Sequence, residues 1–365
     1  MNFDDIRPYN DAEVPEAIKS MVQTDLLAQI VHVVYPNDNV GERIEKLLAV
    51  RTVHELQATF MNDAIKRIVE VTMSSFTYSG LDYLRRSGSY MFVSNHRDIT
   101  LDAFLLQHLL LEKKGNTSYI VFGDNLLSMP VAADMFRCNK LISMPRGGTP
   151  RAFYESLRHL SEYIHHLIET EHHSVWIAQK NGRAKDGIDV TAPAMIKMLA
   201  LGGGEEPLPS LSSLNIVPVS MSYEWDPCDA MKANELAQGR KGGYVKEPGE
   251  DFTSVVTGIV GQKGRVHLAV GKPLSASELV PAQGEDIYGH VANVLDRRIA
   301  RSYHLMPSNY AAYDMLHGER RHYSRYDTAT VRQLNARLTK LADNECRQLM
   351  LEMYANPVDR FFSLR

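Results

Sequence analysis

The stretch FVSNHRDITLDAFLL at residues 92–106 places a histidine, His96, directly after a short apolar run, and two aspartates follow within six residues. An apolar run of this length is typical of a buried strand, so His96 is expected at the rim of a sheet, where open α/β folds bind ligands. A histidine beside a carboxylate is suited to general-base catalysis, because the carboxylate fixes the ring tautomer and stabilises the imidazolium. Capping of the following helix by Asp98 is the alternative use of these side chains.

Polar and cationic residues follow three further apolar runs. KLISMP is followed by Arg146 and two glycines, and NIVPVSMSY ends in Tyr223 and Glu224. SVWIAQ leads into a cluster that contains Lys180, Asn181, Gly182, Arg183 and Lys185. If the runs are parallel strands, their carboxyl ends gather a base, a carboxylate and several cations at one edge of the sheet. Such a set could bind a phosphate monoester and activate a neighbouring hydroxyl group.

Together, the four stretches resemble the ordered blocks of the glycerol-phosphate acyltransferase family. Those blocks are NHxxxxD, a second block that ends in arginine, a third block with Glu-Gly-Thr-Arg, and a strand that carries proline. The similarity covers roughly residues 85–275. It is closest to the glycerol-3-phosphate and lysophosphatidate branch, where NKLISMPRGG, GRAKDG and IVPVSMSYE have counterparts.

The resemblance implies transfer of a fatty acyl group from a thioester, either acyl-coenzyme A or acyl carrier protein, to a hydroxyl group of glycerol-3-phosphate or a lysophospholipid. His96 would be the general base, the two arginines would hold the phosphate, and the lysines would add positive charge. The residues expected at the site are His96 and Asp102 for catalysis and Arg146, Lys180, Asn181, Gly182, Arg183 and Lys185 for substrate binding. No cofactor beyond the thioester donor is implied, and no metal.

Two departures from the family pattern affect this interpretation. The family places four residues between histidine and aspartate, whereas HRDITLD has five before Asp102 and one before Asp98. Alignment on the leucine-rich segment that follows favours Asp102, and Asp98 stays as the alternative. In the third block Asn181 stands where the family has glutamate, which leaves the acceptor open, including an amino-lipid without phosphate.

The composition excludes several other classes of protein. The chain has 365 residues, of which 44% are hydrophobic and 23% charged, as in ordinary soluble proteins. A net charge of -4 gives no overall case for binding nucleic acid. Three cysteines without a CxxC pair suggest a reducing compartment and no structural zinc. With no run of about 20 apolar residues, we predict a cytoplasmic protein that associates peripherally with the inner face of the membrane.

The spacing of apolar residues predicts three regions along the chain. Between residues 85 and 275 short apolar runs alternate with helical stretches, which predicts an α/β acyltransferase domain whose mostly parallel sheet has helices on both faces. Residues 1–84 and 276–365 are expected to form helical N-terminal and C-terminal regions, because their apolar residues recur at helical spacing.

Three other interpretations compete with parts of this picture. His166, Glu169 and His173 share one face of a predicted helix, either as metal ligands or as the polar side of an amphipathic helix. GDNLLSMPVAADMF at residues 123–136 is either core or the wall of an acyl-chain groove. The whole domain could also be a catalytically silent lipid-binding module on the same fold.

Overall fold

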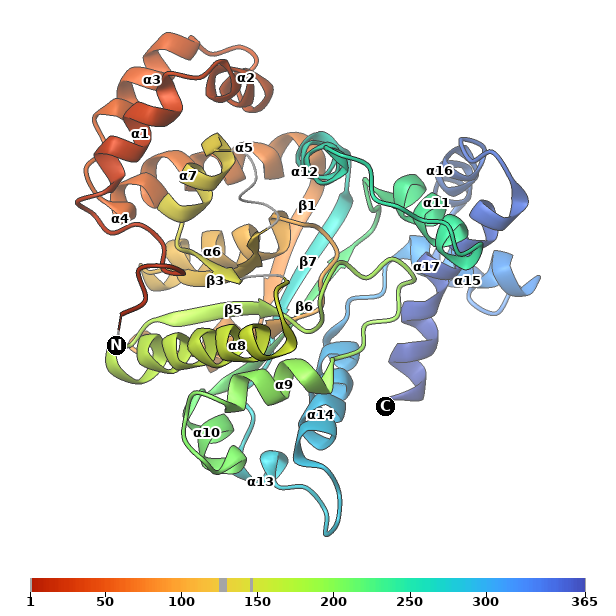
Figure 1. The fold of residues 1–365 in the computed structure, drawn as a ribbon. Coiled ribbons are helices and arrows are strands. Elements are labelled where there is room, and N and C mark those ends of the chain that lie inside the picture. The colour runs from red at the N-terminus through yellow and green to blue at the C-terminus, as the bar shows by residue number, and fades with distance from the viewer. Residues whose placement is uncertain (1, 125–129, 145–146, 365) are drawn as a thin grey trace.

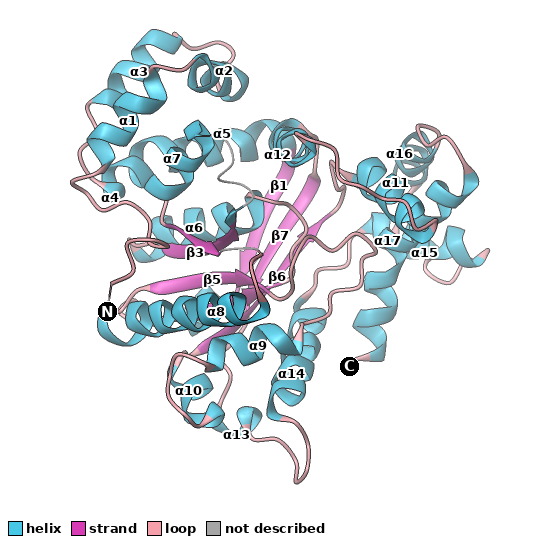
Figure 2. Ribbon diagram, in the orientation of Figure 1, coloured by secondary structure: helices cyan, strands magenta, loops and turns pink. Residues whose placement is uncertain are grey.

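The computed structural model describes residues 2–124, 130–144 and 147–364. The strands in these ranges are β1 (Met73–Ser79), β2 (Met91–Ser94), β3 (Ser118–Gly123), β4 (Leu141–Met144), β5 (Ser174–Ala178), β6 (Ile216–Tyr223) and β7 (Gly264–Val270). They form one sheet in the order β1-β7-β6-β2-β5-β3-β4 (Figures 1 and 2). The five strands from β6 to β4 are parallel, whereas β7 pairs antiparallel with β6 and parallel with β1.

Helices cover both faces of this sheet (Figure 1). One face packs against α5 (Asn62–Thr72), α6 (Leu101–Lys114), α7 (Pro130–Cys138) and α12 (Glu250–Val260). The other packs against α8 (Pro150–His165), α9 (Pro193–Ala200), α10 (Pro207–Ser213), α13 (Ala276–Leu279) and α14 (Ile287–Ser302). Along β2, Phe92 enters the first cluster while Met91 and Val93 enter the second, because successive strand residues point to opposite faces. The predicted α/β class is therefore confirmed.

Further helices lie at both ends of the chain. The N-terminal helices α1 (Val14–Val22), α2 (Asp25–Val34), α3 (Val40–Leu48) and α4 (Val53–Leu56) share an apolar cluster of their own, and a π-helical turn, Gln57–Met61, leads into α5. At the other end α15 (Pro307–His317), α16 (Thr328–Leu338) and α17 (Asn344–Ser363) pack with α11 (Asp229–Arg240). None of the helices in the described ranges combines the length and hydrophobicity needed to cross a bilayer.

One prediction for the N-terminal region is wrong. Residues 1–84 were expected to be helical, but residues 73–79 form β1, which pairs with β7 at the edge of the sheet. The reason lies in the burial of the strand: Met73 is its one buried residue, and the others are partly or fully exposed. A strand at the sheet edge can be rich in serine and threonine, so β1 lacks the apolar run that identified the other six strands.

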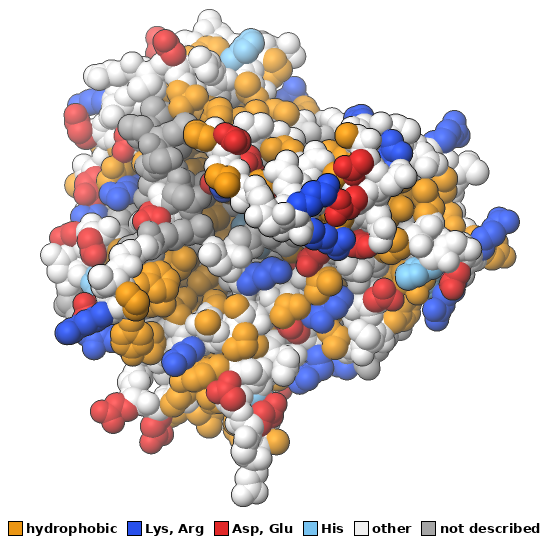
Figure 3. All heavy atoms as spheres, turned by 45° about the vertical axis from the view of Figure 1, so that its right-hand side comes forward, with side chains coloured by type: hydrophobic (Ala, Val, Ile, Leu, Met, Phe, Trp, Pro, Cys, Tyr) orange, Lys and Arg blue, Asp and Glu red, His pale blue; other side chains and the backbone are white. Residues whose placement is uncertain are grey.

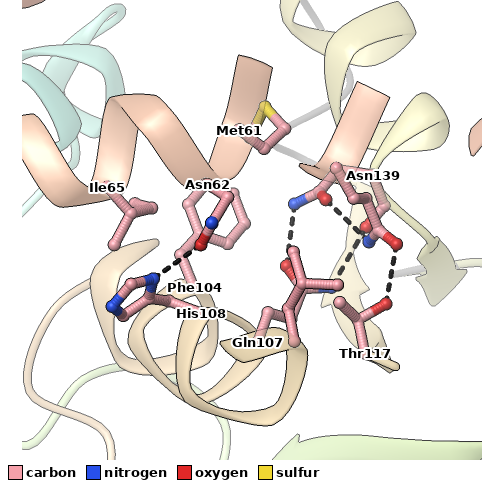
Figure 4. Close-up of a pocket in the computed structure, with 10 residues that line it drawn as sticks. Met61, Asn62, Ile65, Phe104, Gln107, His108, Thr117 and Asn139 are labelled. Atoms are coloured by element: carbon pink, nitrogen blue, oxygen red, sulfur yellow. Dashed lines mark hydrogen bonds between the residues drawn. The ribbon is translucent and has the colours of Figure 1, made fainter. Parts of the chain in front are cut away.

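A buried polar network joins the N-terminal helices to the α/β domain (Figure 4). The side-chain amide of Gln57 donates to Oδ1 of Asn139 at 3.0 Å, and the hydroxyl group of Thr117 donates to Oε1 of Gln57 at 2.7 Å. Asn139 in turn donates to Oε1 of Gln107 on α6 at 2.9 Å. All four side chains are buried. Because these buried polar groups satisfy one another's hydrogen bonds, the network fixes how the N-terminal helices pack against the domain.

Candidate active site

His96 lies just after β2, and Asp102 lies in the first turn of α6. Nδ1 of His96 is 2.9 Å from Oδ2 of Asp102, whose side chain is fully buried. The same oxygen accepts the backbone N–H groups of Arg97 at 2.6 Å and Asp98 at 3.0 Å, so the loop itself holds the carboxylate in place. Because a carboxylate is an acceptor, Nδ1 carries the ring proton and Nε2 is left as the basic nitrogen. No described residue forms a hydrogen bond with Nε2.

Asp98 has a different set of partners. Its Oδ1 accepts the backbone N–H groups of Thr100 at 3.0 Å and Leu101 at 2.9 Å, at the start of α6. Burial, followed by the nearby charge of Asp102, raises the pKa of Asp98. Of the two aspartates that the sequence offered, Asp102 therefore contacts the histidine, and Asp98 binds the start of the helix.

Tyr223, at the carboxyl end of β6, completes the contacts of Asp102. Its hydroxyl group donates to Oδ1 of Asp102 at 2.9 Å. Burial, together with the charge of Asp102, raises the pKa of Tyr223 well above 10, so the hydroxyl group keeps its proton and remains a donor. The sequence predicted that Tyr223 ends a strand, and this position was the signal that could have linked it to the site. It suggested no role for the side chain.

A second network fixes the backbone that carries the histidine. The side-chain amide of Asn95 exchanges two hydrogen bonds with the backbone of Met221 on β6, at 2.7 and 3.0 Å. Arg97 forms a buried ion pair with Asp189 at 2.6 Å. Lys232 of α11, fully buried, donates to the carbonyl oxygen of Arg97 at 2.6 Å. Sequence reasoning assigned no role to these residues, because nothing in the sequence around Asp189 or Lys232 indicates burial of the charge.

Two cavities meet at His96. One, of about 120 Å³, is lined largely by charged side chains: Arg183, Lys185, Glu235, Lys246, Glu250 and Asp251. The other, of about 250 Å³, is mainly apolar and is lined among others by Val121, Phe122, Met144, Trp176, Met195 and Met198. The edge of the Trp176 ring packs against the His96 ring, with centroids 5.7 Å apart. We name these the charged cavity and the small apolar cavity.

The third block of the sequence lies between these cavities. Gly182, with a left-handed φ of 77°, lines both of them. Arg183 reaches the charged cavity, where its Nη2 donates to Ser254 at 3.1 Å and its buried Nη1 has no partner among the described residues. Lys185 forms an ion pair with Glu235 in the same cavity. Burial, and then the charge of Arg183, lowers the pKa of Lys185.

The remaining predicted binding residues lie elsewhere. Lys180 and Asn181 line the small apolar cavity, and the ammonium group of Lys180 is 3.4 Å from the carbonyl oxygen of Ile188. Arg146 lies outside the described residues. Of the predicted set, the charged cavity therefore brings together His96, Gly182, Arg183 and Lys185.

The three residues of the metal interpretation have separate partners. His166 pairs with Glu171 at 3.1 Å, and the Glu169 carboxylate lies 2.7 Å from Nδ1 of His165. The His173 ring packs against Tyr119, with centroids 5.3 Å apart. Across residues 2–124, 130–144 and 147–364, no group of three or more histidine, cysteine, aspartate or glutamate side chains could hold a metal ion.

A match to a family model agrees with this geometry. Residues 75–199 match the family model described as Acyltransferase, and this segment contains His96, Asp102 and the third block. Among solved structures, the chain is similar to the 1-acyl-sn-glycerophosphate acyltransferase of Thermotoga maritima, with 13% identity, a TM-score of 0.40 and coverage of 78% of this chain and 93% of that one. No curated protein sequence matches the chain. Residues 75–199 are therefore an acyltransferase-family domain, as the sequence predicted.

Proposed function

We propose that the protein transfers a fatty acyl group from a thioester, acyl-coenzyme A or acyl carrier protein, to a hydroxyl group of glycerol-3-phosphate or a lysophospholipid. One observation carries this proposal. His96, hydrogen-bonded to a buried Asp102, stands where a charged cavity and an apolar cavity meet. In the charged cavity the buried Nη1 of Arg183 has no partner among the described residues, which suits a phosphorylated acceptor. The apolar cavity suits the hydrocarbon chain of the donor.

The chemistry follows from the free nitrogen of His96. Nε2 removes the proton of the acceptor hydroxyl group as its oxygen attacks the thioester carbonyl carbon. The new O–C bond gives a tetrahedral intermediate, whose collapse breaks the C–S bond and releases the thiolate, which takes the proton back from the imidazolium. Asp102 holds the ring through Nδ1–H and stabilises the imidazolium. Because the substrate hydroxyl group is the nucleophile, the scheme needs no acyl-enzyme and no cofactor beyond the thioester.

Arg183 is the main proposed phosphate ligand. Its Nη1 is buried without a partner among the described residues, and such a group gains most from a charged acceptor. Lys185 adds positive charge from the same cavity. At Gly182 the space where a Cβ would lie has no atom within 4 Å, so the substrate can approach the backbone. We include Arg146 as a second phosphate ligand on the family pattern alone. We place Lys180 and Asn181 among the residues that contact the acyl donor.

The family match and the charged cavity each support one of the alternatives raised by the sequence. The match favours an enzyme over a catalytically silent lipid-binding module. Arg183, whose buried Nη1 has no partner among the described residues, favours a phosphorylated acceptor over an amino-lipid, whose own cation it would repel. Since the products are membrane lipids, we propose that the protein works in the cytoplasm at the inner face of the membrane. Flotation with anionic liposomes tests this location; a protein that stays in the aqueous fraction at every lipid composition contradicts it.

The function is tested by thiol release from palmitoyl-coenzyme A with four acceptors. These are glycerol-3-phosphate, 1-acylglycerol-3-phosphate and the phosphate-free counterpart of each. We expect turnover with a phosphorylated acceptor and a loss of at least about a hundredfold in His96→Ala. His166→Ala, which changes a partly exposed histidine outside both cavities, is the control and should keep its rate. Retention of more than about a tenth of the rate in His96→Ala contradicts the general-base role.

A further inference from the structure

A third cavity, of about 550 Å³, lies outside the site described above and is here named the large apolar cavity. It is bounded by helices α2, α5, α7 and α12, by the start of α6 and by the loop that precedes α12. Its side chains include Ile30, Val34, Ile68, Phe136, Phe252 and Val256. It has more than twice the volume of the small apolar cavity and falls within the range of about 300–1,000 Å³ seen for ligand pockets.

The apolar lining of this cavity is accessible in the folded protein. Phe252, at the start of α12, is 37% exposed, and Val255 and Val256 are partly exposed. Figure 3 shows hydrophobic side chains gathered in the upper part of the molecule, above a row of Lys and Arg side chains. Soluble proteins rarely leave a large apolar concavity open without a ligand or partner for it. The cavity therefore fits an apolar ligand.

The large apolar cavity adjoins the charged cavity. Lys246 and Asp251 line both cavities and form an ion pair with each other, so this pair stands at their junction. On the α6 side, Ile99 lines the charged cavity and Leu101 lines the large apolar one. A molecule whose phosphate lies beside Arg183 can therefore extend past the Lys246–Asp251 pair into an apolar space.

The position of the large apolar cavity relative to His96 indicates whether it would bind the hydrocarbon chain of the donor or that of the acceptor. The chain of the acyl donor begins at the carbonyl carbon under attack, so its cavity must include His96. The small apolar cavity includes His96, and the large one does not. The large apolar cavity instead adjoins, through Lys246 and Asp251, the charged cavity in which Arg183 would hold the phosphate of the acceptor. A chain in this cavity therefore belongs to the molecule that carries the phosphate.

We propose that the large apolar cavity binds the hydrocarbon chain of the acceptor, which is then a single-chain phosphate ester such as a 1-acylglycerol-3-phosphate. This inference rests on the proposed function and narrows its acceptor. Helices α2 and α12, which supply much of the wall, lie outside residues 75–199, so the site is built by parts of the chain beyond the matched domain.

The test measures acceptor binding by calorimetry in the absence of any thioester. The probes are glycerol-3-phosphate and its 1-hexanoyl, 1-octanoyl and 1-decanoyl esters, each kept below the concentration at which it forms micelles. Each buried methylene should strengthen binding roughly fourfold, so two methylenes should give roughly a fifteenfold gain. Affinity that does not change from the hexanoyl to the decanoyl ester overturns the proposal.

Two variants fill the large apolar cavity from opposite walls. Ala64→Phe acts from α5 and Val256→Phe from α12. In both, the gain per two methylenes should drop below about threefold, while the affinity for glycerol-3-phosphate stays unchanged. Val33→Phe is the matched control, because Val33 is 47% exposed on α2 and does not line the cavity. Thermal unfolding checks each fold; if one filled variant unfolds early, the other and the wild-type series still decide.

The remaining outcomes separate the two proposals. A full chain-length gain in both filled variants places the chain elsewhere and overturns the inference. A change in preference for donor chain length in the filled variants, measured with octanoyl- to palmitoyl-coenzyme A and the 1-hexanoyl ester as acceptor, assigns the cavity to the donor and also overturns it. His96-dependent thiol release with a phosphorylated acceptor would survive either result, so the proposed function would stand. Conversely, chain-length-dependent binding without any turnover would contradict the proposed function and leave the cavity assignment intact.

Discussion

The hydroxyl group of Tyr223 donates to Oδ1 of Asp102 across 2.9 Å, while Oδ2 of the same carboxylate contacts His96. Tyr223 ends β6, which pairs directly with β2, the strand that leads to His96. Both oxygens of Asp102 therefore have buried partners, and these fix the plane of the carboxylate. Because the ring of His96 bonds to that carboxylate, the tyrosine also sets the direction in which Nε2 points.

Tyr223→Phe should lower kcat/KM about tenfold, since it removes a hydrogen bond to a charged group worth roughly 1.5–3 kcal/mol and part of this loss falls on the transition state. A carboxylate with one donor fewer attracts the imidazolium more strongly, so the acid limb of the pH profile should move to higher pH. The measurement is kcat/KM for thiol release between pH 5 and 9. Tyr90→Phe, which alters a hydrogen-bonded buried tyrosine before β2, is the control. Loss of rate with an unmoved acid limb would indicate a merely structural role.

Asp102→Asn and Asp98→Asn should differ sharply, although each replaces a buried carboxylate by its isosteric amide. An amide at position 102 cannot stabilise the imidazolium, so the rate should fall about 10² to 10⁴-fold. At position 98 the amide oxygen can still accept the N–H groups of Thr100 and Leu101. Burial and Asp102 raise the pKa of Asp98, so removal of its charge should cost little stability. Initial rates and thermal unfolding of both variants are the measurements; equal losses of rate would contradict the assignment.

The pair His96 and Asp102 was accessible from the sequence because it is local. Six positions apart, the two residues span the end of one strand and the first turn of the next helix. The choice between Asp98 and Asp102 was harder to make from the sequence, because both follow His96 within six residues. What distinguishes them is which backbone N–H groups each carboxylate accepts. The sequence likewise did not show that Lys180 and Arg183 line different cavities. Gly182, which lies between them in the chain, has a left-handed conformation.

Other parts of the site depend on contacts between distant segments. Lys232 and Asp189 support the loop around Arg97 from elements that follow it by many residues, and their own surroundings in the sequence resemble solvated surface. The large apolar cavity combines α2 with α12, which lie far apart in the sequence. Spacing along the sequence carries no information about such a pairing, because each helix alone reads as an ordinary amphipathic segment.

Lys263 should make the free energy of unfolding depend on pH in the alkaline range. Its buried ammonium group donates to the carbonyl oxygen of Gly261 at 2.7 Å and to Thr72 at 3.0 Å, and burial lowers its pKa from 10.5 to about 8. Between these two pH values the unfolded chain binds a proton that the folded chain has released, so the free energy of unfolding rises with pH. Lys263 should contribute up to about 3 kcal/mol to this rise, so the rise should be smaller by that amount in Lys263→Met. Urea unfolding of both proteins at pH 7.5 and 10 measures it; an equal rise in both contradicts the assignment.

Arg183→Ala should weaken binding of the acceptor and leave binding of the donor nearly unchanged. Arg183 lines the charged cavity with one unpartnered buried nitrogen among the described residues, and each charged hydrogen bond to a phosphate should contribute roughly 1.5–3 kcal/mol. The half-saturation concentration of the phosphorylated acceptor should therefore rise about 10 to 150-fold. Arg183→Lys should restore part of this loss, since lysine supplies charge without the planar fork. Arg151→Ala, at a solvent-exposed position on α8, is the control. The measurement is steady-state kinetics with phosphorylated and phosphate-free acceptors. A phosphate ligand affects the phosphorylated acceptor alone, so equal weakening of both contradicts the proposed role of Arg183.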